Sequence, residues 1–514
     1  MNLARNLELS ALFFPNHVAI REGDRKLTYA QLNDQVNRVA TGLISMGVKP
    51  GDLIALCAPN SADWIIFYFG IIKAGGVAVT LFSTITSGEL INLLNHSKPK
   101  MIFTTPNRLP DLANLKASGM LEQAICTTES DLTLQGLVEK GSGSFKAIDM
   151  ERDDTAAILY TGGTTGLPKG VMLTHAGISF SSQAIAVYEH CTEDDLAICF
   201  QPFNHVFGQI HIMNATIMTA GCLELMPSLD IDRVLALMEE GRVTKFFSVP
   251  TVYVRLLGVP DLKKKLGKVR YCFSAGASMA MEIVKQWKEL TGITIAESYG
   301  MTEVMPITFN HYYPEKHVVG SVGQPVQGVE VQIRDVSSGH LLEQGQEGEI
   351  CIRGYNVMKG YLNNPEATRE AFWYSKGDKR RRQAEAFFRS GDIGVCDKNG
   401  YISIVDRLKD LIITGGENVF PREVEESLYT WPAVEECVAV GLPDKEWGER
   451  VAAFIIPKPG QTIDANALKT YLKGRLAPFK VPKEYIIVSD LPKSPAGKIL
   501  KREVKKQHLE KNKQ

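Results

Sequence analysis

The chain has 514 residues, which is too long for one hydrophobic core, so two or more domains are expected. Hydrophobic residues make up 44% and charged residues 22%, a balance typical of a folded globular enzyme and not of a disordered protein. The formal net charge of −1 gives no electrostatic reason to expect a nucleic acid or a membrane surface as a partner.

The cysteines and the apolar segments indicate the cellular compartment in which the protein is expected. Nine scattered cysteines without a C-x-x-C pair favour buried thiols in a reducing compartment over a disulfide framework or a zinc site. The first residues, MNLARNLELSALFFPNH, lack the long apolar core of a signal peptide. The most apolar stretch, 64–82, is interrupted by Lys73 and Gly75, so a buried helix, a turn and a strand are predicted there and not a membrane span. We therefore expect a cytoplasmic protein.

Short β-rich runs alternate with helix-patterned segments in the first half of the chain. These runs lie at 53–59, 100–105, 156–161, 245–250 and 269–276. Strands that alternate with helices predict parallel sheets in an α/β fold. From about residue 320, VEVQIRD, GEICIRG and GYISIVD are separated by turn residues, which indicates a mainly β section. The remainder is predicted to be a small α+β unit with a lysine-rich tail.

The segment AAILYTGGTTGLPKGVMLTH (156–175) predicts a phosphate-binding loop of an unusual kind. It is not a Walker loop, because Lys169 follows Pro168 and precedes Gly170, and no G-x-G-x-x-G occurs in the chain. A Gly- and Thr-rich turn after a buried strand can surround a polyphosphate with backbone N–H groups, and Lys169 can add a positive charge. The alternative interpretation is a flexible surface loop.

A second cluster, ESYGMTE (297–303), offers groups for a nucleotide and a metal ion. Tyr299 can place its ring against a base, Thr302 can contact a phosphate, and Glu303 can hold Mg²⁺ through a carboxylate oxygen. Taken alone, the segment is better explained as an ordinary loop with an exposed acid.

Three single residues complete the set. Asp392 in RSGDIG is a candidate acceptor for ribose hydroxyls, and Arg407 in YISIVDRLKD lies beside a candidate domain boundary. Lys498 in LPKSPAGKILKR follows Pro495 and Gly497, which predict a turn. Each of these residues alone is weak evidence for a nucleotide site, and only the combination of all the motifs indicates a function.

In this combination the chain resembles the adenylate-forming superfamily of acyl-CoA synthetases, nonribosomal-peptide adenylation domains and beetle luciferases. The motifs YTGGTTGLPKG, PFNHVFG, SAGASM, ESYGMTE, RSGD, DRLKDLIITGGENVFPREVEE and PKSPAGK occur in the family order over essentially the whole chain. The resemblance implies a large N-terminal domain (1–405) of two α/β subdomains plus a β-barrel. A hinge (406–409) around Lys409 would connect it to a small mobile α+β C-terminal domain (410–514).

The resemblance also implies a two-step reaction with ATP, Mg²⁺ and coenzyme A. A carboxylic acid attacks the α-phosphate to give acyl-AMP and pyrophosphate, and after rotation of the C-terminal domain the thiol of coenzyme A displaces AMP. The implied catalytic residues are Lys498, Thr302, Glu303 and His205, with Glu303 on the metal ion and Gly415 and Gly416 along the coenzyme A tunnel. The implied ATP-binding residues are Thr161, Gly162, Gly163, Thr164, Thr165, Gly166, Lys169, Gly276, Ala277, Glu297, Ser298, Tyr299, Gly300, Met301, Thr302, Asp392, Arg407 and Lys498.

Two departures from the family pattern stand out. Gly163 occupies a position where many relatives have Ser, which removes one hydroxyl donor and no backbone N–H. The basic segment YSKGDKRRRQAEAFF (374–388) replaces a shorter segment. We interpret it as a solvated insertion in preference to a contact for the phosphates of coenzyme A.

The acyl site is predicted to accept an uncharged acyl group. Relatives that activate amino acids carry an Asp where this chain has Asn204 and His205, and a buried ammonium without a counter-charge is costly. The segments VFGQIHIMN, FFSVPTVY and VMPITF contain no Arg and no acid. We therefore expect a medium-sized apolar acid (medium-chain, alicyclic or aromatic). The implied acyl-binding residues are His205, Phe207, Gly208, Ala275 and Gly276, with Gly208 leaving space between its bulky neighbours.

Three other functions remain open from the sequence. A luciferase-like monooxygenase shares nearly every motif, and an acyl-AMP ligase that serves a carrier protein differs only in the thiol acceptor. A non-catalytic nucleotide-binding module is disfavoured because Glu303 and Lys498 are both present. The sequence leaves the oligomeric state undecided.

Overall fold

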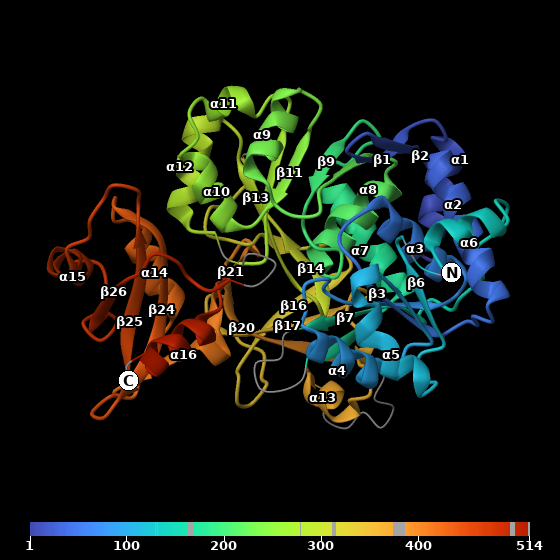
Figure 1. Cartoon of the computed structure of the whole chain (residues 1–514). Coiled ribbons are helices and arrows are strands. Elements are labelled where there is room, and N and C mark those ends of the chain that lie inside the picture. Colours follow the sequence, from blue (N-terminus) through green and yellow to red (C-terminus); the bar gives the residue numbers. More distant parts are fainter. Residues whose placement is uncertain are drawn as a thin grey trace.

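The computed structural model describes residues 1–128, 130, 132–161, 168–277, 279–310, 315–373, 386–493 and 499–511. In Figure 1, the chain up to about residue 407 forms a large body, and the remaining residues form a smaller domain at its side. Four sheets organise the described residues, three in the large body and one in the small domain.

The first sheet has seven strands in the order β18-β8-β7-β4-β3-β5-β6, parallel from β7 to β6. Its strands are β3 Leu53–Cys57, β4 Val77–Thr80, β5 Met101–Thr104, β6 Gln123–Cys126, β7 Thr155–Thr161, β8 Lys169–Thr174 and β18 Gly360–Tyr361. The apolar stretch 64–82 forms most of helix α3 (Ala62–Lys73), a turn and β4, so the prediction of a buried helix, turn and strand is confirmed. Among the described residues, no helix has both the length and the apolar character needed to cross a bilayer.

The second sheet has nine strands in the order β15-β14-β13-β12-β11-β9-β10-β1-β2. They are β1 Val18–Glu22, β2 Arg25–Thr28, β9 Leu196–Cys199, β10 Cys222–Leu225, β11 Lys245–Ser248, β12 Tyr271–Ser274, β13 Ile295–Met301, β14 Val304–Phe309 and β15 Gln324–Pro325. The centre is parallel, and β13 and β14 form an antiparallel hairpin. Tyr299 therefore lies within a strand, where the sequence predicted a loop after one.

The third sheet forms the mainly β section predicted after residue 320, and its strands pair antiparallel. It contains β16 Val329–Arg334, β17 Gly348–Gly354, β19 Phe372–Trp373, β20 Phe387–Cys396 and β21 Ile402–Arg407. Among the described residues its pairings follow β16-β17-β20-β19, with β21 also on β20, and do not close into a barrel.

The small domain has a five-stranded sheet with helices beside it. The strands are β22 Ile412–Thr414, β23 Glu417–Val419, β24 Val434–Asp444, β25 Gly448–Pro457 and β26 Glu484–Ile487, and the helices are α14 Pro421–Tyr429, α15 Ala465–Lys473 and α16 Lys501–Lys511. The chain leaves the third sheet at Arg407 and enters this sheet at Ile412. The short helix η4 (Leu408–Asp410) lies between them, in the range where the hinge is predicted.

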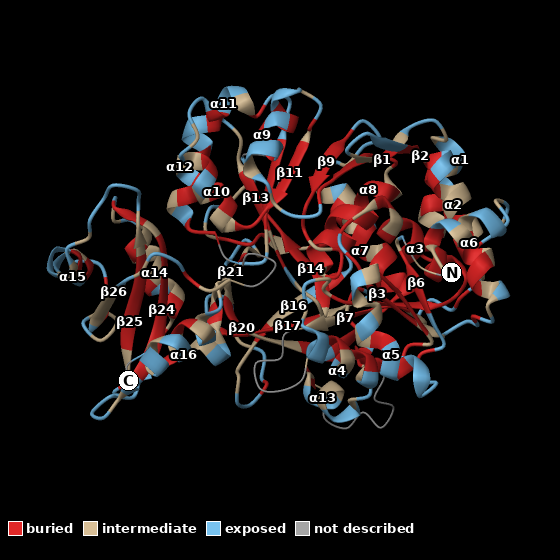
Figure 2. Cartoon of the chain, in the orientation of Figure 1, coloured by how far each residue is buried: buried red, intermediate tan, exposed pale blue. Residues whose placement is uncertain are grey.

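Helices of the large body cover the sheets and begin at recognisable caps. Thr28 and Thr86 form capping boxes with Gln31 and Glu89, which satisfies free N–H groups at the first turn. Figure 2 shows that burial is concentrated in the strands and on the inner faces of the helices. These helices are α1 Arg5–Phe13, α2 Tyr29–Ser45, α4 Ser87–Ser97, η1 Pro106–Arg108, α5 Leu109–Ala117, α6 Leu134–Lys140, α7 His175–Tyr188, η2 Phe207–Asn214, α8 Ala215–Met218, α9 Ile231–Glu239, α10 Pro250–Leu257, α11 Leu262–Lys265, α12 Met281–Thr291 and α13 Pro365–Glu370.

Candidate active site

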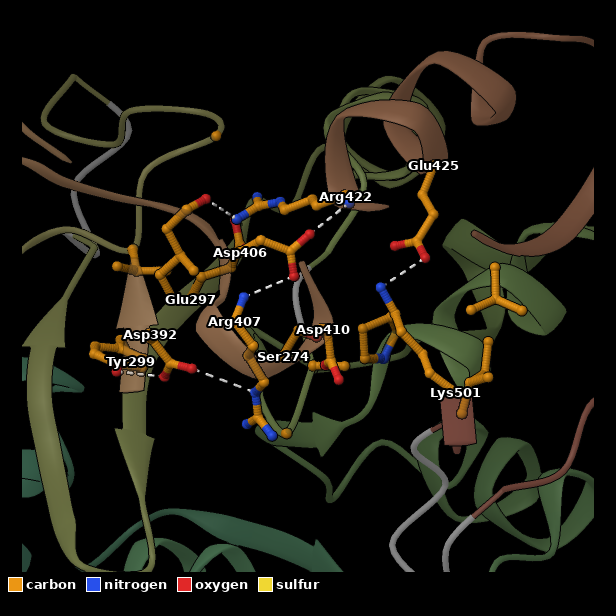
Figure 3. Close-up of a pocket in the computed structure, with 18 of the residues that line it drawn as sticks. Ser274, Glu297, Tyr299, Asp392, Asp406, Arg407, Asp410, Arg422, Glu425 and Lys501 are labelled. Atoms are coloured by element: carbon orange, nitrogen blue, oxygen red, sulfur yellow. Dashed lines mark hydrogen bonds and ion pairs between the residues drawn. The ribbon is translucent and has the colours of Figure 1, made fainter. Parts of the chain in front are cut away.

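A cavity of about 230 Å³ lies where the small domain meets the large body. Its walls come from the ends of β12 and β13, from β20 and β21, from α14 and from the start of α16 (Figure 3). The lining includes Gly276, Ala277, Glu297, Ser298, Tyr299, Gly300, Asp392 and Arg407, all predicted to bind ATP. The fold therefore brings together residues that are far apart in the sequence.

Tyr299, Asp392 and Arg407 form a connected group in this cavity. The Tyr299 hydroxyl donates to Asp392 Oδ2 at 2.5 Å, and Arg407 Nε lies 3.4 Å from Asp392 Oδ1. Burial, with the negative charge of Asp392, raises the pKa of Tyr299 well above its usual value, so the hydroxyl remains a donor. Gly276 has a φ of +85°, a conformation that lets backbone approach a ligand closely. An aromatic ring, a carboxylate and a guanidinium around a glycine turn fit an adenine nucleotide.

Two predicted residues for the phosphates and the metal ion meet at Tyr361. The Tyr361 hydroxyl donates to Glu303 Oε1 at 2.9 Å, and Lys169 Nζ lies 4.7 Å from the centre of the Tyr361 ring. Burial raises the pKa of Glu303, which a bound cation would oppose. No group of three or more metal-ligating side chains occurs in the described part of the chain. A single carboxylate still fits Mg²⁺, which is commonly held by one or two carboxylates, substrate phosphates and water.

Several predicted residues flank this centre. Thr161 pairs with Lys169 at the end of the β7–β8 hairpin, and Thr302 contributes to a small pocket with Ile210 and Met305. Met301 is the last residue of β13. Gly162, Gly163, Thr164, Thr165, Gly166 and Lys498 lie outside the described residues, as does most of the basic insertion 374–388.

Charged residues of the small domain also face the cavity, and sequence reasoning did not identify them. Arg422 donates from its backbone N–H to Asp406 Oδ2 at 2.8 Å, and Lys501 Nζ lies 2.9 Å from Glu425 Oε1. Glu426 accepts from the backbone N–H of Met281 in the large body at 3.2 Å. The charge-rich segment PREVEES (421–427), in the first part of the predicted C-terminal domain, was the signal that could have found Arg422, Glu425 and Glu426.

Glu297 is a buried carboxylate of the cavity lining whose pKa depends on charged residues of the small domain. Burial raises its pKa to about 7, Arg422 lowers it and Glu426 raises it. The electrostatic influence of two α14 residues on Glu297 couples this carboxyl group to the position of the small domain.

The wall predicted to bind the acyl group begins at a π-helix, η2. His205 accepts a hydrogen bond at Nδ1 from the backbone N–H of Phe207 (3.1 Å), and both side chains belong to the predicted wall. Ala275 donates its backbone N–H to Ser248 O, beside Gly276 at the cavity. Turns of the π type occur frequently at functional sites.

One expectation about this wall is wrong, and one neighbour of the wall was not expected. A Cβ atom on Gly208 would lie 2.5 Å from the carbonyl oxygens of Gln201 and Pro202, so Gly208 faces backbone and leaves no space for an acyl group. The three segments of the wall contain no acid, but Glu189 from the adjoining segment lies 2.6 Å from His211 of η2. Sequence pattern could not show either fact, since both depend on which distant segment packs against the helix.

Gly415, Gly416 and Lys409 do not line the cavity. Gly415 and Gly416 are exposed in the β22–β23 turn with φ of +60° and +84°, and a Cβ on Gly415 would lie 2.5 Å from the Trp447 ring. Lys409 is exposed in η4. In this arrangement the glycine turn does not reach the nucleotide cavity.

Comparison with known proteins identifies the family. The chain matches the model of the AMP-binding enzymes over residues 7–362 and that of the AMP-binding enzyme C-terminal domain over residues 423–498. The chain belongs to the AMP-binding enzymes. Within this family it is an acyl-CoA synthetase of the adenylate-forming superfamily, an AMP-forming ligase that joins a carboxylic acid to coenzyme A with ATP and Mg²⁺.

Individual relatives of this AMP-binding enzyme differ in the acids that they are named for. The chain is 32% identical to a long-chain-fatty-acid–CoA ligase of Bacillus subtilis (98% of this chain, 93% of that protein). It is 34% identical to a feruloyl-CoA synthase of an Amycolatopsis species (96% of each).

The solved structure of MatB from Rhodopseudomonas palustris is similar over the whole chain. Sequence identity is 34%, and the match covers 99% of both chains. The TM-score is 0.90 for the ATP-bound form and 0.82 for the apo form. The arrangement of the present structure is therefore more similar to the ATP-bound form.

Proposed function

We propose that this ligase activates a medium-sized, largely apolar carboxylic acid (medium-chain, alicyclic or aromatic) and transfers the acyl group to coenzyme A. The observation that carries the proposal is the cluster of buried aromatic rings next to the nucleotide cavity. Phe273 precedes Ser274, which lines the cavity, and its ring lies 5.8 Å from Phe207 of η2 and 5.8 Å from Phe309 of β14. Apolar rings favour an apolar acyl group and oppose a second charge.

The cavity residues, Glu303 and the family motif around Lys498 support the following division of roles. Tyr299 and Asp392 hold the base and ribose, Glu303 holds Mg²⁺, and Lys498 stabilises the charge that builds up between the carboxylate and the α-phosphate. In the first step an oxygen of the acid bonds to the α-phosphorus and the bond to pyrophosphate breaks. Magnesium neutralises phosphate charge when it is bound. A positioned cation in a site that excludes water lowers the barrier because it stabilises developing charge without reorganisation.

We assign the present arrangement to the first step. The greater similarity to the ATP-bound form of MatB supports this assignment, and so does the position of Ile499 and Lys501 in the cavity lining. In the second step the thiol sulfur bonds to the acyl carbon and the bond to AMP breaks. That step requires rotation about residues 406–409 to bring Gly415 and Gly416 to the acyl-AMP.

A pyrophosphate-release screen over a panel of carboxylic acids, with and without coenzyme A, tests this function. We expect release with medium-sized acids and an acyl-CoA product when coenzyme A is present. A product with holo-carrier protein and none with coenzyme A would identify the carrier-protein ligase instead. Light emission with a luciferin would identify the monooxygenase, and nucleotide binding without any pyrophosphate would identify a binding module.

A further inference from the structure

The short strand β18 joins two hairpins of the large body. On one side, Tyr361 pairs with Val171 of β8, in the β7–β8 hairpin that also carries Lys169. On the other side, the backbone N–H of Met358 donates to the carbonyl oxygen of Glu303 at 2.8 Å, at the turn of the β13–β14 hairpin. The segment from Met358 to Tyr361 therefore ties the hairpin of Lys169 to the hairpin of Glu303.

Tyr361 is buried, and its backbone is fixed on both sides. The residue is 8% exposed, and its backbone N–H donates to Thr368 Oγ1 at 2.9 Å. The preceding Gly360 has a φ of +145°, which glycine adopts without a steric penalty, and a Cβ there would lie 2.9 Å from Thr368 Cγ2. The place of the Tyr361 ring is therefore determined before any ligand binds.

The side chain of Tyr361 contacts an anion with its hydroxyl and a cation with its ring. The hydroxyl donates to Glu303 Oε1 at 2.9 Å, and Lys169 Nζ lies 4.7 Å from the ring centre. A carboxylate has about four lone-pair sites, so one hydroxyl leaves sites for a metal ion. Lys169 is exposed and Glu303 is half-buried, so a ligand can approach both from solvent.

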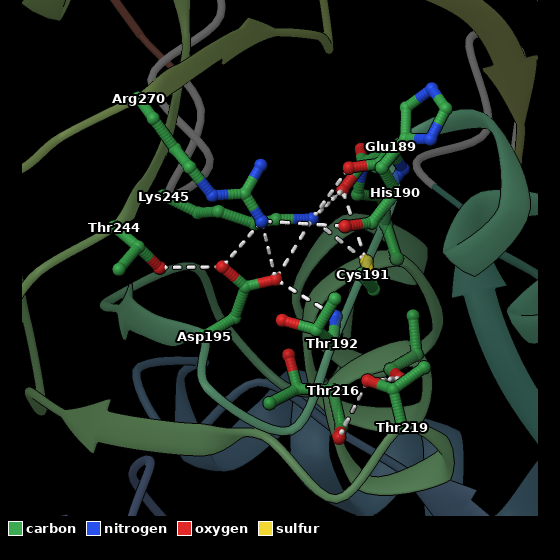
Figure 4. Close-up of polar contacts among 12 residues, drawn as sticks. Glu189, His190, Cys191, Thr192, Asp195, Thr216, Thr219, Thr244, Lys245 and Arg270 are labelled. Atoms are coloured by element: carbon green, nitrogen blue, oxygen red, sulfur yellow. Dashed lines mark hydrogen bonds and ion pairs between the residues drawn. The ribbon is translucent and has the colours of Figure 1, made fainter.

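Lys169 and Glu303 do not pair with each other. Among the described residues, no carboxylate oxygen lies within 4.0 Å of Lys169 Nζ. A lysine in the second sheet behaves differently, because Lys245 Nζ lies 3.6 Å from Glu189 Oε2 in a buried charge network (Figure 4). Near the phosphate loop, Tyr361 gives the lysine and the carboxylate another partner each.

We infer that Tyr361 is a positioning residue of the adenylation step: its hydroxyl orients the Glu303 carboxylate for Mg²⁺, and its ring keeps Lys169 from pairing with that carboxylate. This inference rests on the proposed function, in which Glu303 holds the metal ion. An ion pair between Lys169 and Glu303 would occupy both the carboxylate and the ammonium before ATP binds. The hydrogen-bond partners of metal ligands orient those ligands, and their loss commonly costs 10- to 100-fold in metal affinity or activity.

Binding of ATP in the absence of an acid substrate measures this role without catalysis. Titration calorimetry of the full chain gives the Kd of ATP with and without Mg²⁺, and the ratio of the two values is the gain from the metal ion. Tyr361→Phe keeps the ring and removes the hydroxyl, so the gain should fall by roughly 10-fold, with the metal-free Kd unchanged. A gain equal to that of the wild type overturns the inference.

Tyr361→Leu tests the ring. It lets Lys169 pair with Glu303, so the metal-free Kd of ATP should rise by roughly 2- to 5-fold, the scale of one exposed charge interaction. An equal metal-free Kd for the Phe and Leu variants overturns the role of the ring. Tyr355 is exposed and has Arg152 at 4.9 Å from its ring centre, so Tyr355→Phe is the control that should leave both constants unchanged.

Glu303→Gln separates this inference from the proposed function. If Glu303 holds Mg²⁺, this variant reduces the gain, and the addition of Tyr361→Phe to it has no further effect. An unchanged gain in Glu303→Gln contradicts the proposed role of Glu303, and the inference fails with it. A reduced gain in Glu303→Gln beside a normal gain in Tyr361→Phe contradicts the inference alone. Thermal unfolding identifies a variant that has not folded, and if Tyr361→Leu is one, Tyr361→Phe decides.

Discussion

The nucleotide cavity and the acyl wall are neighbours built in different ways. Around the cavity, polar side chains from β13, β20 and β21 meet one another, as in Tyr299–Asp392–Arg407. Behind the acyl wall, charges such as Glu189 and Lys245 are buried and paired with one another. The first region is open to a ligand, whereas in the second the fold has already satisfied nearly every charge. The reaction type is therefore encoded in local motifs, and the choice of acid depends on tertiary packing.

The largest effect is expected at Lys498, which we propose to act in the first step. Lys498→Ala should reduce acyl-AMP formation by on the order of 10²-fold or more, the scale for loss of one strong electrostatic stabiliser. It should still convert supplied acyl-AMP to acyl-CoA. Single-turnover measurement of both half-reactions checks this, with Lys506→Ala on the exposed side of α16 as the control. Equal damage to both half-reactions would remove Lys498 from the first step.

Asp392 tests whether the polar cluster holds the nucleotide. Asp392→Asn keeps the size of the side chain but removes the charge that faces Tyr299 and Arg407. Hydrogen bonds to charged groups contribute about 1.5–3 kcal/mol, so the KM for ATP should rise by roughly 10- to 150-fold. The exposed Asp397, just after the same strand, provides the control Asp397→Asn. An unchanged KM for ATP would place the ribose elsewhere.

On the acyl side, Gly208 should affect folding and not selectivity. A methyl group at this position meets two backbone carbonyls at 2.5 Å, and overpacking costs about 1–3 kcal/mol, so Gly208→Ala should lower the free energy of unfolding by that amount. Gly88→Ala is the control, because Gly88 lies in α4 with open space around it and Ala favours a helix. If Gly208→Ala changes acid selectivity at full stability, Gly208 lines the acyl site after all.

The smallest effect is expected from the pH dependence of Glu297. Its pKa of about 7 is above the usual value for an exposed Glu, so between these values the folded state binds a proton that the unfolded state releases. Stability from this group is present at low pH and is lost as pH rises towards about 7.

Thermal unfolding from about pH 5 to about pH 8 measures this contribution. The Tm of the wild type should fall relative to that of Glu297→Gln by on the order of a few degrees over this range. The exposed Glu289 gives the control Glu289→Gln, which should follow the wild type. Parallel curves for wild type and Glu297→Gln would mean that Glu297 does not titrate in this range.

The contrast between the nucleotide cavity and the acyl wall explains how much could be predicted from the sequence. Apolar runs identified strands such as β3, β5 and β7, and the interruption at Lys73 and Gly75 identified the helix, turn and strand at 64–82. The cavity residues Tyr299, Asp392 and Arg407 were predicted because ordered motifs carry them. Local pattern was sufficient where function depends on a strand end or a turn.

The remaining features depend on distant contacts. Gly208 meets the backbone at 201–202, and Glu189 reaches His211 across 22 positions. Arg422 faces Asp406 only because the small domain is placed against the large body. Hydrophobic period and motif spacing do not report which segment packs against which, so these residues could be found only in the structure.

Acid-dependent exchange of labelled pyrophosphate into ATP, measured without coenzyme A, tests the central claim most directly. The interdomain cavity is assigned to acyl-AMP formation, so exchange should occur with a suitable medium-sized acid, require Mg²⁺ and need no thiol. Asp392→Asn and Lys498→Ala should both suppress it. Exchange that requires coenzyme A, or formation of ADP and phosphate in place of AMP and pyrophosphate, would contradict the account.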